Sequence, residues 1–70
     1  MRISVNGISK NLEADNQEVK LTNALEYLGY KPNTVVVELN NLIINSTKWD
    51  YQTLKDGDKL EIVSIVGGDN

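Results

Sequence analysis

The first residues of the chain alternate strictly between apolar and polar. Residues 1–6 read Met-Arg-Ile-Ser-Val-Asn, and a period of two is typical of a strand with one buried face. Asn6-Gly7 then supplies two residues that tolerate positive φ, so residues 8–13 can return as a second strand. The pattern predicts a β-hairpin at the start of the chain.

A helix is predicted next, because apolar residues recur at i, i+3, i+4 and i+7 and so share one helix face. These residues are Leu21, Ala24, Leu25 and Leu28. Gly29 suits the left-handed position after a helix and Pro32 prevents continuation, so we expect the helix to end at Leu28. Asp15 and Glu18 have the spacing of a capping box and are candidates for its N-terminal cap.

The middle of the chain predicts two strands joined by a tight turn. Residues 34–39 are rich in β-branched side chains and apolar up to Glu38, which favours a strand buried on more than one side, at the sheet centre. Asn40-Asn41 is a plausible turn before a short strand at residues 42–44.

The last third of the chain predicts a loop, a short helical turn and a long strand. Residues 45–48 are polar and include an Asn-Ser-Thr glycosylation triplet that we expect to sit in a turn. Trp49 and Leu54 are expected in a short turn of helix whose apolar side chains close one end of the core. Residues 56–58 are expected to form a turn before a strand at 59–66, in which Leu60, Ile62 and Ser64 face one way and Glu61, Val63 and Ile65 the other.

This order of elements predicts an α+β domain with the β-grasp (ubiquitin-like) layout. One main helix would pack on one face of a mixed four- to five-stranded sheet, in which the first and last long strands pair in parallel at the centre. We expect a single domain over residues 1–66. Residues 67–70 have no side chain able to anchor the backbone, so they are expected to form a flexible C-terminal tail.

Composition removes several classes of function. The 70 residues contain no Cys and no His, which excludes thiolate nucleophiles, Cys/His metal sites and the usual general base. A net charge of −3 argues against binding to nucleic acid, because phosphate contacts need a surplus of cations. We expect a cytoplasmic protein, monomeric when free, with no signal peptide and no membrane span, since no apolar run approaches the length of either.

Three local patterns could suggest chemistry but have simpler explanations. Asp56-Gly57-Asp58 lacks the alternating ligands of a calcium loop, so a turn is favoured. Asp50, Asp56 and Asp58 have no sign of a cleft that would tune an acid/base group and are expected to be solvated. Trp49 and Tyr51 could form a stacking platform, but in an acidic chain an aromatic pair more often packs at the core edge.

The Gly67-Gly68 pair at the end of the last strand is the most informative motif. A backbone without side chains can enter a narrow channel, because glycine lets one backbone approach another without a Cβ clash. Such an end could deliver a main-chain carboxylate into the active site of another protein.

Several motifs stand in the order and spacing of a known family. They are Ile3-Ser4-Val5-Asn6-Gly7, Ala24-Leu25 with Leu28-Gly29, Val35-Val36-Val37-Glu38-Leu39-Asn40 with Trp49, Leu54 with Asp56-Gly57-Asp58, Leu60-Glu61-Ile62-Val63, and Val66-Gly67-Gly68. Over nearly all of its 70 residues the chain resembles the ThiS family, the ubiquitin-like sulfur carriers of thiamine thiazole biosynthesis.

The resemblance implies a role as a protein co-substrate rather than an enzyme. Gly68 would be the site of adenylation and of the thiocarboxylate, and Gly67 would give the tail access. The implied partners are a ThiF-like adenylating enzyme that uses ATP, a sulfur donor protein and a ThiG-like thiazole synthase. No catalytic residue, metal or stably bound cofactor is expected in the chain itself.

One departure from the family pattern affects this expectation. Asp69 and Asn70 follow Gly68, so the Gly68 carboxyl group is held in a peptide bond, and we expect a protease to remove the two residues. Two alternatives stay open: a carrier resembling the small subunit of molybdopterin synthase, and a β-grasp binding module whose tail has no chemical role.

Overall fold

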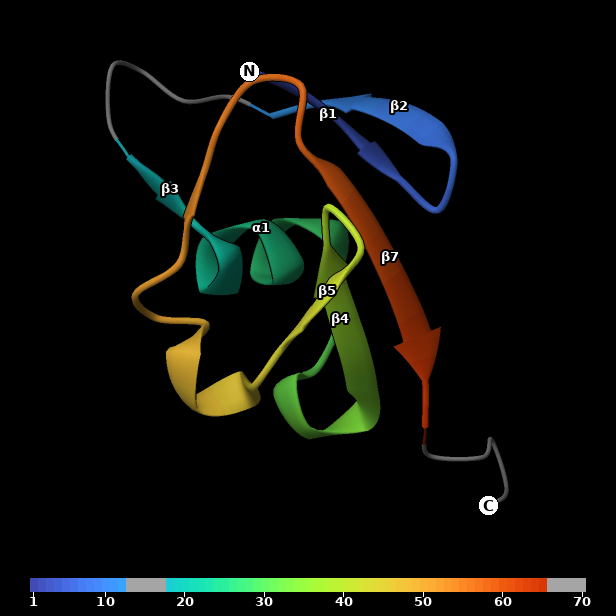
Figure 1. Cartoon of the computed structure of the whole chain (residues 1–70), viewed down its shortest axis with the longest axis vertical. Coiled ribbons are helices and arrows are strands. Elements are labelled where there is room, and N and C mark those ends of the chain that lie inside the picture. The colour runs from blue at the N-terminus through green and yellow to red at the C-terminus, as the bar shows by residue number, and fades with distance from the viewer. Residues whose placement is uncertain (13–17, 66–70) are drawn as a thin grey trace.

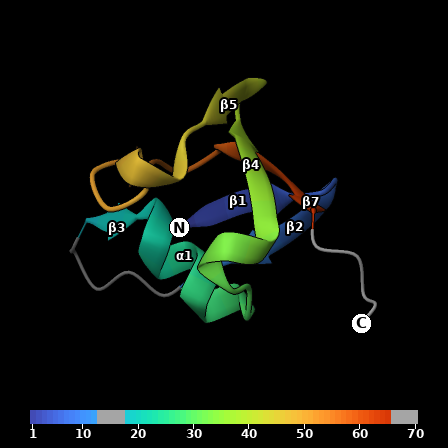
Figure 2. The same cartoon turned by 90° about the horizontal axis from the view of Figure 1, so that it is seen from below.

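A computed structural model describes residues 1–12 and 18–65 (Figure 1). In chain order, the elements are β1 (Arg2–Val5), β2 (Ile8–Asn11), β3 (Val19–Lys20), α1 (Leu21–Leu28), the 3₁₀ turn η1 (Pro32–Thr34), β4 (Val35–Leu39), β5 (Leu42–Ile44), the 3₁₀ turn η2 (Ser46–Lys48), β6 (Thr53–Leu54) and β7 (Lys59–Ser64). Five of the described strands form a mixed sheet in the order β2-β1-β7-β4-β5, and β3 pairs with β6 separately. With α1 on one side of this sheet (Figure 2), the predicted β-grasp architecture is confirmed.

The core joins the helix to the three inner strands. Its largest fully buried side chains are Ile3, Leu21, Val37 and Leu60, which come from β1, α1, β4 and β7 respectively. No buried polar or charged side chain occurs in the described part of the chain. Burial of apolar surface is the main favourable term in folding, so these four elements hold the domain together.

The strand β7 lies in the middle of the five-stranded sheet. It pairs in parallel with β1, with Val5 opposite Leu60, and antiparallel with β4, with Val37 opposite Ile62. The predicted parallel pairing of the first and last strands is therefore confirmed. Residues 34–39 were predicted to lie in the middle of the sheet, and β4 is indeed an inner strand, between the central strand β7 and the edge strand β5. The prediction that it is buried on more than one side is wrong: its outer side chains are half-exposed because α1 covers only one face.

The predicted turns and the predicted end of the helix are confirmed. Asn6 and Gly7 both have positive φ, 52° and 83°, and so do Asn40 and Asn41, at 50° and 74°. The helix α1 ends at Leu28, and Gly29 follows in the left-handed region with φ of 90°. These are the backbone conformations that Asn and Gly adopt most readily.

The start of the helix differs from the prediction. α1 begins at Leu21, directly after β3, and the Asn23 side chain accepts a hydrogen bond from the Lys20 backbone N–H at 3.1 Å. Glu18 therefore lies before the helix, so the proposed capping box is wrong; Asp15, its other member, lies outside the described residues.

The segment around Trp49 also differs in its secondary structure. The helical turn is η2, which precedes Trp49 and occupies the stretch predicted to be a loop. The Asn45 side chain caps this turn by accepting a hydrogen bond from the Thr47 N–H at 2.9 Å. Trp49 and Leu54 are buried as expected, but Leu54 belongs to β6, which pairs with β3.

The Asn6 side chain links the first hairpin to β7. Its Oδ1 accepts a hydrogen bond from the Ile62 N–H at 2.7 Å, and its Nδ2 donates to the Ile62 carbonyl oxygen at 3.2 Å. The Asn6 backbone N–H donates to the Leu60 carbonyl oxygen at 2.9 Å. One side chain thus continues the β1–β7 ladder past the last residue of β1.

We predict that Asn6→Ala destabilises the domain more than the matched change Asn41→Ala. Both residues have positive φ, but in the described part of the chain Asn41 makes no side-chain hydrogen bond. We expect Asn6→Ala to lower the free energy of unfolding by about 2–3 kcal/mol and Asn41→Ala by about 1 kcal/mol, measured by urea denaturation. Equal losses would show that the bonds to Ile62 contribute nothing.

Candidate functional site

The described part of the chain ends beside the sheet at Ile65, two positions before the glycine pair. The Ile65 N–H donates a hydrogen bond to the Thr34 carbonyl oxygen at 2.9 Å, so the pairing of β7 with the β4 side continues to this residue. Gly67 and Gly68, the predicted site residues, lie outside the described residues, as do Asp69 and Asn70. The structure therefore fixes the strand from which the candidate tail continues, which is the central one.

The side of the sheet away from α1 carries a cluster of exposed aliphatic side chains. Val63 and Ile65 are each 59% exposed and Ile43 is 68% exposed. Val36 is half-exposed and lies directly opposite Val63. We call this cluster, consisting of Val36, Ile43, Val63 and Ile65, the apolar face.

Only half of the apolar face could be predicted from the sequence. Alternation along residues 59–66 indicates that Val63 and Ile65 share a side, and their exposure confirms it. Val36 and Ile43 join them only through the strand register, in which Ile43 lies opposite Glu38. The Asn40-Asn41 turn was the available signal, because a two-residue hairpin turn fixes the register of the strands that it joins.

Two carboxylates lie next to the apolar face on the same side of the sheet. Glu38 on β4 and Glu61 on β7 are directly opposite in the register, and both are half-exposed. Neither side chain makes a hydrogen bond or an ion pair within the described part of the chain. The face therefore combines an apolar surface with an unneutralised negative pair.

The one ion pair among residues 1–12 and 18–65 lies elsewhere, at the start of α1. The Lys20 Nζ and Glu18 Oε1 atoms are 2.8 Å apart, and hydrogen bonding and charge from Lys20 lower the pKa of Glu18. In both Figure 1 and Figure 2, β3, which contains Lys20, lies on the other side of the molecule from the end of β7. This pair does not neutralise the candidate site.

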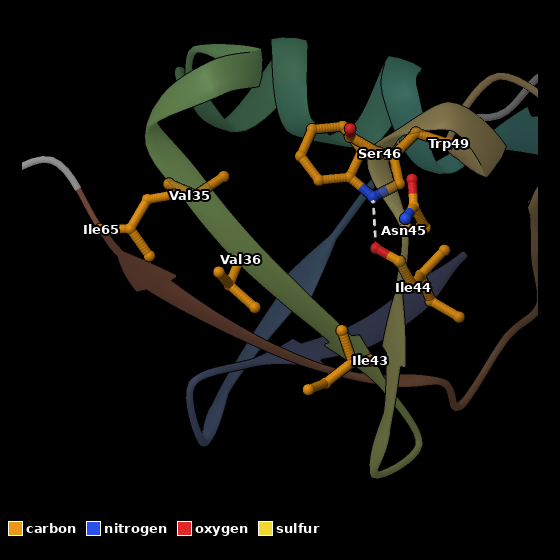
Figure 3. A pocket seen from close by; sticks show the side chains of 8 residues that line it. All are labelled: Val35, Val36, Ile43, Ile44, Asn45, Ser46, Trp49 and Ile65. Carbon is orange, nitrogen blue, oxygen red and sulfur yellow. Dashed lines mark hydrogen bonds between the residues drawn. The ribbon is translucent and has the colours of Figure 1, made fainter.

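An open groove of about 230 Å³ borders the apolar face (Figure 3). The groove forms because β5 pairs only with Val37, Glu38 and Leu39. The first half of β4 therefore has no neighbouring strand on the β5 side. The groove is mainly aliphatic and is lined by Val35, Val36, Ile43, Ile44, Asn45, Ser46, Trp49 and Ile65. It lacks the convergent polar groups that usually orient a small ligand, so it extends the apolar face rather than forming a separate catalytic pocket.

The three aspartates considered as acid/base candidates serve the fold. Asp56 accepts a hydrogen bond from the Arg2 N–H at 2.7 Å, and Asp58 accepts one from the Lys55 N–H at 2.7 Å. Asp50 accepts one from the Thr22 hydroxyl group at 2.6 Å. In the described part of the chain, no group of three or more acidic residues could hold a metal ion.

The two aromatic residues considered as a stacking platform are not both available. The Trp49 side chain is 5% exposed, and its Nε1 donates to the Ile44 carbonyl oxygen at 2.9 Å (Figure 3). Only Tyr51, at 80% exposure, could stack on a ligand. Trp49 packs at the edge of the core, as the simpler interpretation predicted, whereas for Tyr51 that interpretation is wrong because its side chain is exposed.

The sheet order, the single covering helix and a central last strand that leads into a glycine pair define a β-grasp protein of the ubiquitin-like class. Comparison with models of protein families identifies one family within this class: the model of the ThiS family matches residues 3–68. The chain belongs to the ThiS family.

Solved structures agree with this assignment. The crystal structure of the thiamine biosynthesis protein ThiS from Geobacter metallireducens superposes with a TM-score of 0.81 at 30% identity, covering 99% of this chain and 100% of that one. The solution structure of a thiamine biosynthesis protein from the same organism gives a TM-score of 0.79 at 28% identity, covering 100% and 90%.

Sequence relatives are of two kinds. The uncharacterised protein ycf40 of Pyropia yezoensis is 36% identical over 66 residues, which are 94% of this chain and 89% of that protein. The thiazole synthase of Magnetococcus marinus is 32% identical over 68 residues, which are 97% of this chain but only 20% of the synthase. The chain thus spans about a fifth of the thiazole synthases that it matches.

No helix in residues 1–12 and 18–65 is both long enough and apolar enough to span a bilayer.

We predict that the same substitution lowers the stability of the domain on one side of the sheet and hardly changes it on the other. Ile62→Thr, in the core, should lower the free energy of unfolding by about 2–4 kcal/mol, because it removes buried apolar volume and buries a hydroxyl group. Ile43→Thr, on the apolar face, should change it by less than about 0.5 kcal/mol. Urea denaturation measures both, and a large loss for Ile43→Thr would show that this face is part of the core.

Proposed function

We propose that the chain is the sulfur carrier of thiamine thiazole synthesis and that its Gly68 carboxylate carries the sulfur. The observation that supports this most directly is the family match, which covers residues 3–68 and ends at Gly68. The structure adds that the strand leading to this residue is the central strand of the sheet. A β-grasp domain that continues into a glycine pair has the form required of a carrier.

The proposed chemistry has two steps, both in partner proteins. In a ThiF-like adenylating enzyme, a carboxylate oxygen of Gly68 attacks the α-phosphorus of ATP, and pyrophosphate leaves. The donor protein then supplies sulfur at the oxidation level of sulfide; this hydrosulfide attacks the acyl carbon, the bond from that carbon to the phosphate oxygen breaks, and AMP leaves. The product is a thiocarboxylate on Gly68, which passes its sulfur to a thiazole synthase.

The chain contributes its backbone to this chemistry and acts as a co-substrate rather than as an enzyme. Because the sulfur is attached to the main chain, the absence of cysteine from the sequence is compatible with the role. Gly67 has no Cβ, so the segment before the reacting carboxylate can enter a narrow active site.

The carboxyl group of Gly68 must first be released, because Asp69 and Asn70 follow it in the sequence. We include in the proposal that a protease removes these two residues. The family match supports Gly68 as the end of the active form, because it stops there and leaves Asp69 and Asn70 outside.

The relatives favour the thiazole pathway over molybdopterin synthesis. In two matching relatives, a segment similar to nearly the whole of this chain makes up about a fifth of a protein named thiazole synthase. A carrier-like segment in the same polypeptide as the synthase supports a functional partnership between the two, and we propose that this chain serves the same type of synthase.

We predict that a chain ending at Gly68 is converted to a thiocarboxylate and that the 70-residue chain is not. Each form would be incubated with ATP, the cognate adenylating enzyme and a sulfur source. Intact-mass spectrometry would then show replacement of one oxygen by sulfur in the Gly68-ending chain. A chain ending at Gly67 is the matched control, since it has a free terminal carboxylate at the wrong position.

Two results would contradict parts of this proposal. If the Gly68-ending chain stays unmodified beside an enzyme that is active on its own carrier, the carrier role is wrong. If protein from its native cells shows only the 70-residue mass, removal of Asp69 and Asn70 does not occur.

A further inference from the structure

The Asn6-Gly7 turn contains the two groups that react when an asparagine loses its side-chain amide. The backbone nitrogen of the following residue can attack the asparagine Cγ and close a succinimide ring. A following glycine favours this attack, because it has no Cβ to obstruct the approach. Asn6-Gly7 is the only Asn-Gly pair in the sequence. Both residues are exposed, and a Cβ added at Gly7 would meet nothing within 4 Å, so the turn is open to water.

In the folded domain the Asn6 side chain is held by a different set of contacts. Its Oδ1 accepts a hydrogen bond from the Ile62 N–H at 2.7 Å, and its Nδ2 donates to the Ile62 carbonyl oxygen at 3.2 Å. The carboxamide group is thus directed at β7, whereas the chain continues through Gly7 into β2, on the other side of β1. Ring closure requires an aligned approach of the Gly7 nitrogen to Cγ. The two bonds to Ile62 oppose the rotation that this approach needs.

We propose that Asn6 is a site of spontaneous deamidation and that its bonds to Ile62 restrict the reaction to chains in which this part of the sheet has opened. The Gly7 nitrogen forms a bond to Asn6 Cγ, and the Cγ–Nδ2 bond breaks. The proton lost by the Gly7 nitrogen passes to the leaving amide group, which departs as ammonia. Water then opens the succinimide at either carbonyl carbon and leaves aspartate or isoaspartate at this position. Water is the sole co-reactant, and no oxidant or reductant is needed.

The product cannot restore the native contact. A carboxylate accepts hydrogen bonds but donates none, so the Ile62 carbonyl oxygen loses its donor and faces a negative charge instead. Isoaspartate also lengthens the main chain within the turn that joins Val5 to Ile8. Local openings of a native protein are transient, but this reaction makes one of them permanent. It loosens β7, the strand that precedes the glycine pair, and it does so whether or not the chain carries sulfur.

The test follows deamidation of the full chain at mildly alkaline pH, in buffer and in urea. Intact-mass spectrometry detects replacement of the amide NH₂ by OH, and peptide mapping locates it. We expect the rate at Asn6 to be at least roughly tenfold higher in urea, because in buffer the reaction must wait for an unfavourable opening. A peptide with the sequence of residues 3–10 has no β7 to bind, so it gives the effect of urea itself and corrects the comparison.

A second measurement tests the consequence of the modification. Asn6→Asp reproduces one product, and we expect it to speed hydrogen exchange of the Ile62 amide, which loses the intact carboxamide contact. Asn41→Asp makes the same change at another residue with positive φ and should leave that exchange rate unaltered. Equal corrected rates of deamidation in buffer and in urea would overturn the proposed protection. An Asn6 that stays intact in urea would overturn the site itself, whether or not the variant folds.

Discussion

The structure depends on the pairing of β7 with both β1 and β4. The parallel pairing places Ser4 opposite Lys59, so nearly the whole chain lies between the two paired strands, whereas β4 and β7 are closer in sequence. Such non-local pairing carries an entropic cost of loop closure. It is offset by apolar burial at the same place, because Leu60 and Ile62 lie among the buried side chains of β1, β4 and α1. The bonds from Asn6 to Ile62 hold this strand where the β1 ladder would otherwise end.

This constraint has a functional consequence, because the strand that organises the sheet is also the strand that precedes the glycine pair. On one side the backbone is paired with β4 up to Ser64, and the Ile65 N–H is still bonded to Thr34. On the other side, pairing with β1 and the bonds from Asn6 hold it up to Ile62. Because the last strand is held in this way, the point at which the tail begins has a fixed position relative to the apolar face. A partner that binds this face therefore meets the start of the tail in a defined orientation.

The sequence predicted the parts of the fold that local chemistry determines. Asn6-Gly7, Asn40-Asn41 and Gly29 each occupy a backbone conformation that few other residues tolerate, so the turns and the helix end could be placed correctly. The β3–β6 pair could not be predicted, because a strand of two residues is too short to show a period. The capping-box interpretation of Asp15 and Glu18 failed because β3 intervenes and the helix starts only at Leu21.

The candidate site was harder to predict, since it depends on how strands are placed beside one another. The burial of β4 on both faces was predicted wrongly, because its β-branched residues do not reveal that α1 covers only one face, and Val36 was therefore not expected to be half-exposed. Gly67 and Gly68 were singled out from the sequence and lie outside the described residues. The apolar face could be identified in full only from the strand register of the structure.

The exposed side chains of the outer face are better explained by a partner than by the requirements of the sheet. A sheet favours β-branched residues at such positions, and threonine would meet that preference without exposing aliphatic surface. Instead, Ile43, Val63 and Ile65 are all more than half exposed, on the side that α1 leaves uncovered. Apolar patches of this kind are typical of surfaces that another protein covers, and the adjacent Glu38–Glu61 pair adds negative charge to this one. A neutral or acidic surface would leave two carboxylates desolvated and unpaired, which is unfavourable, whereas a basic surface would relieve their mutual repulsion.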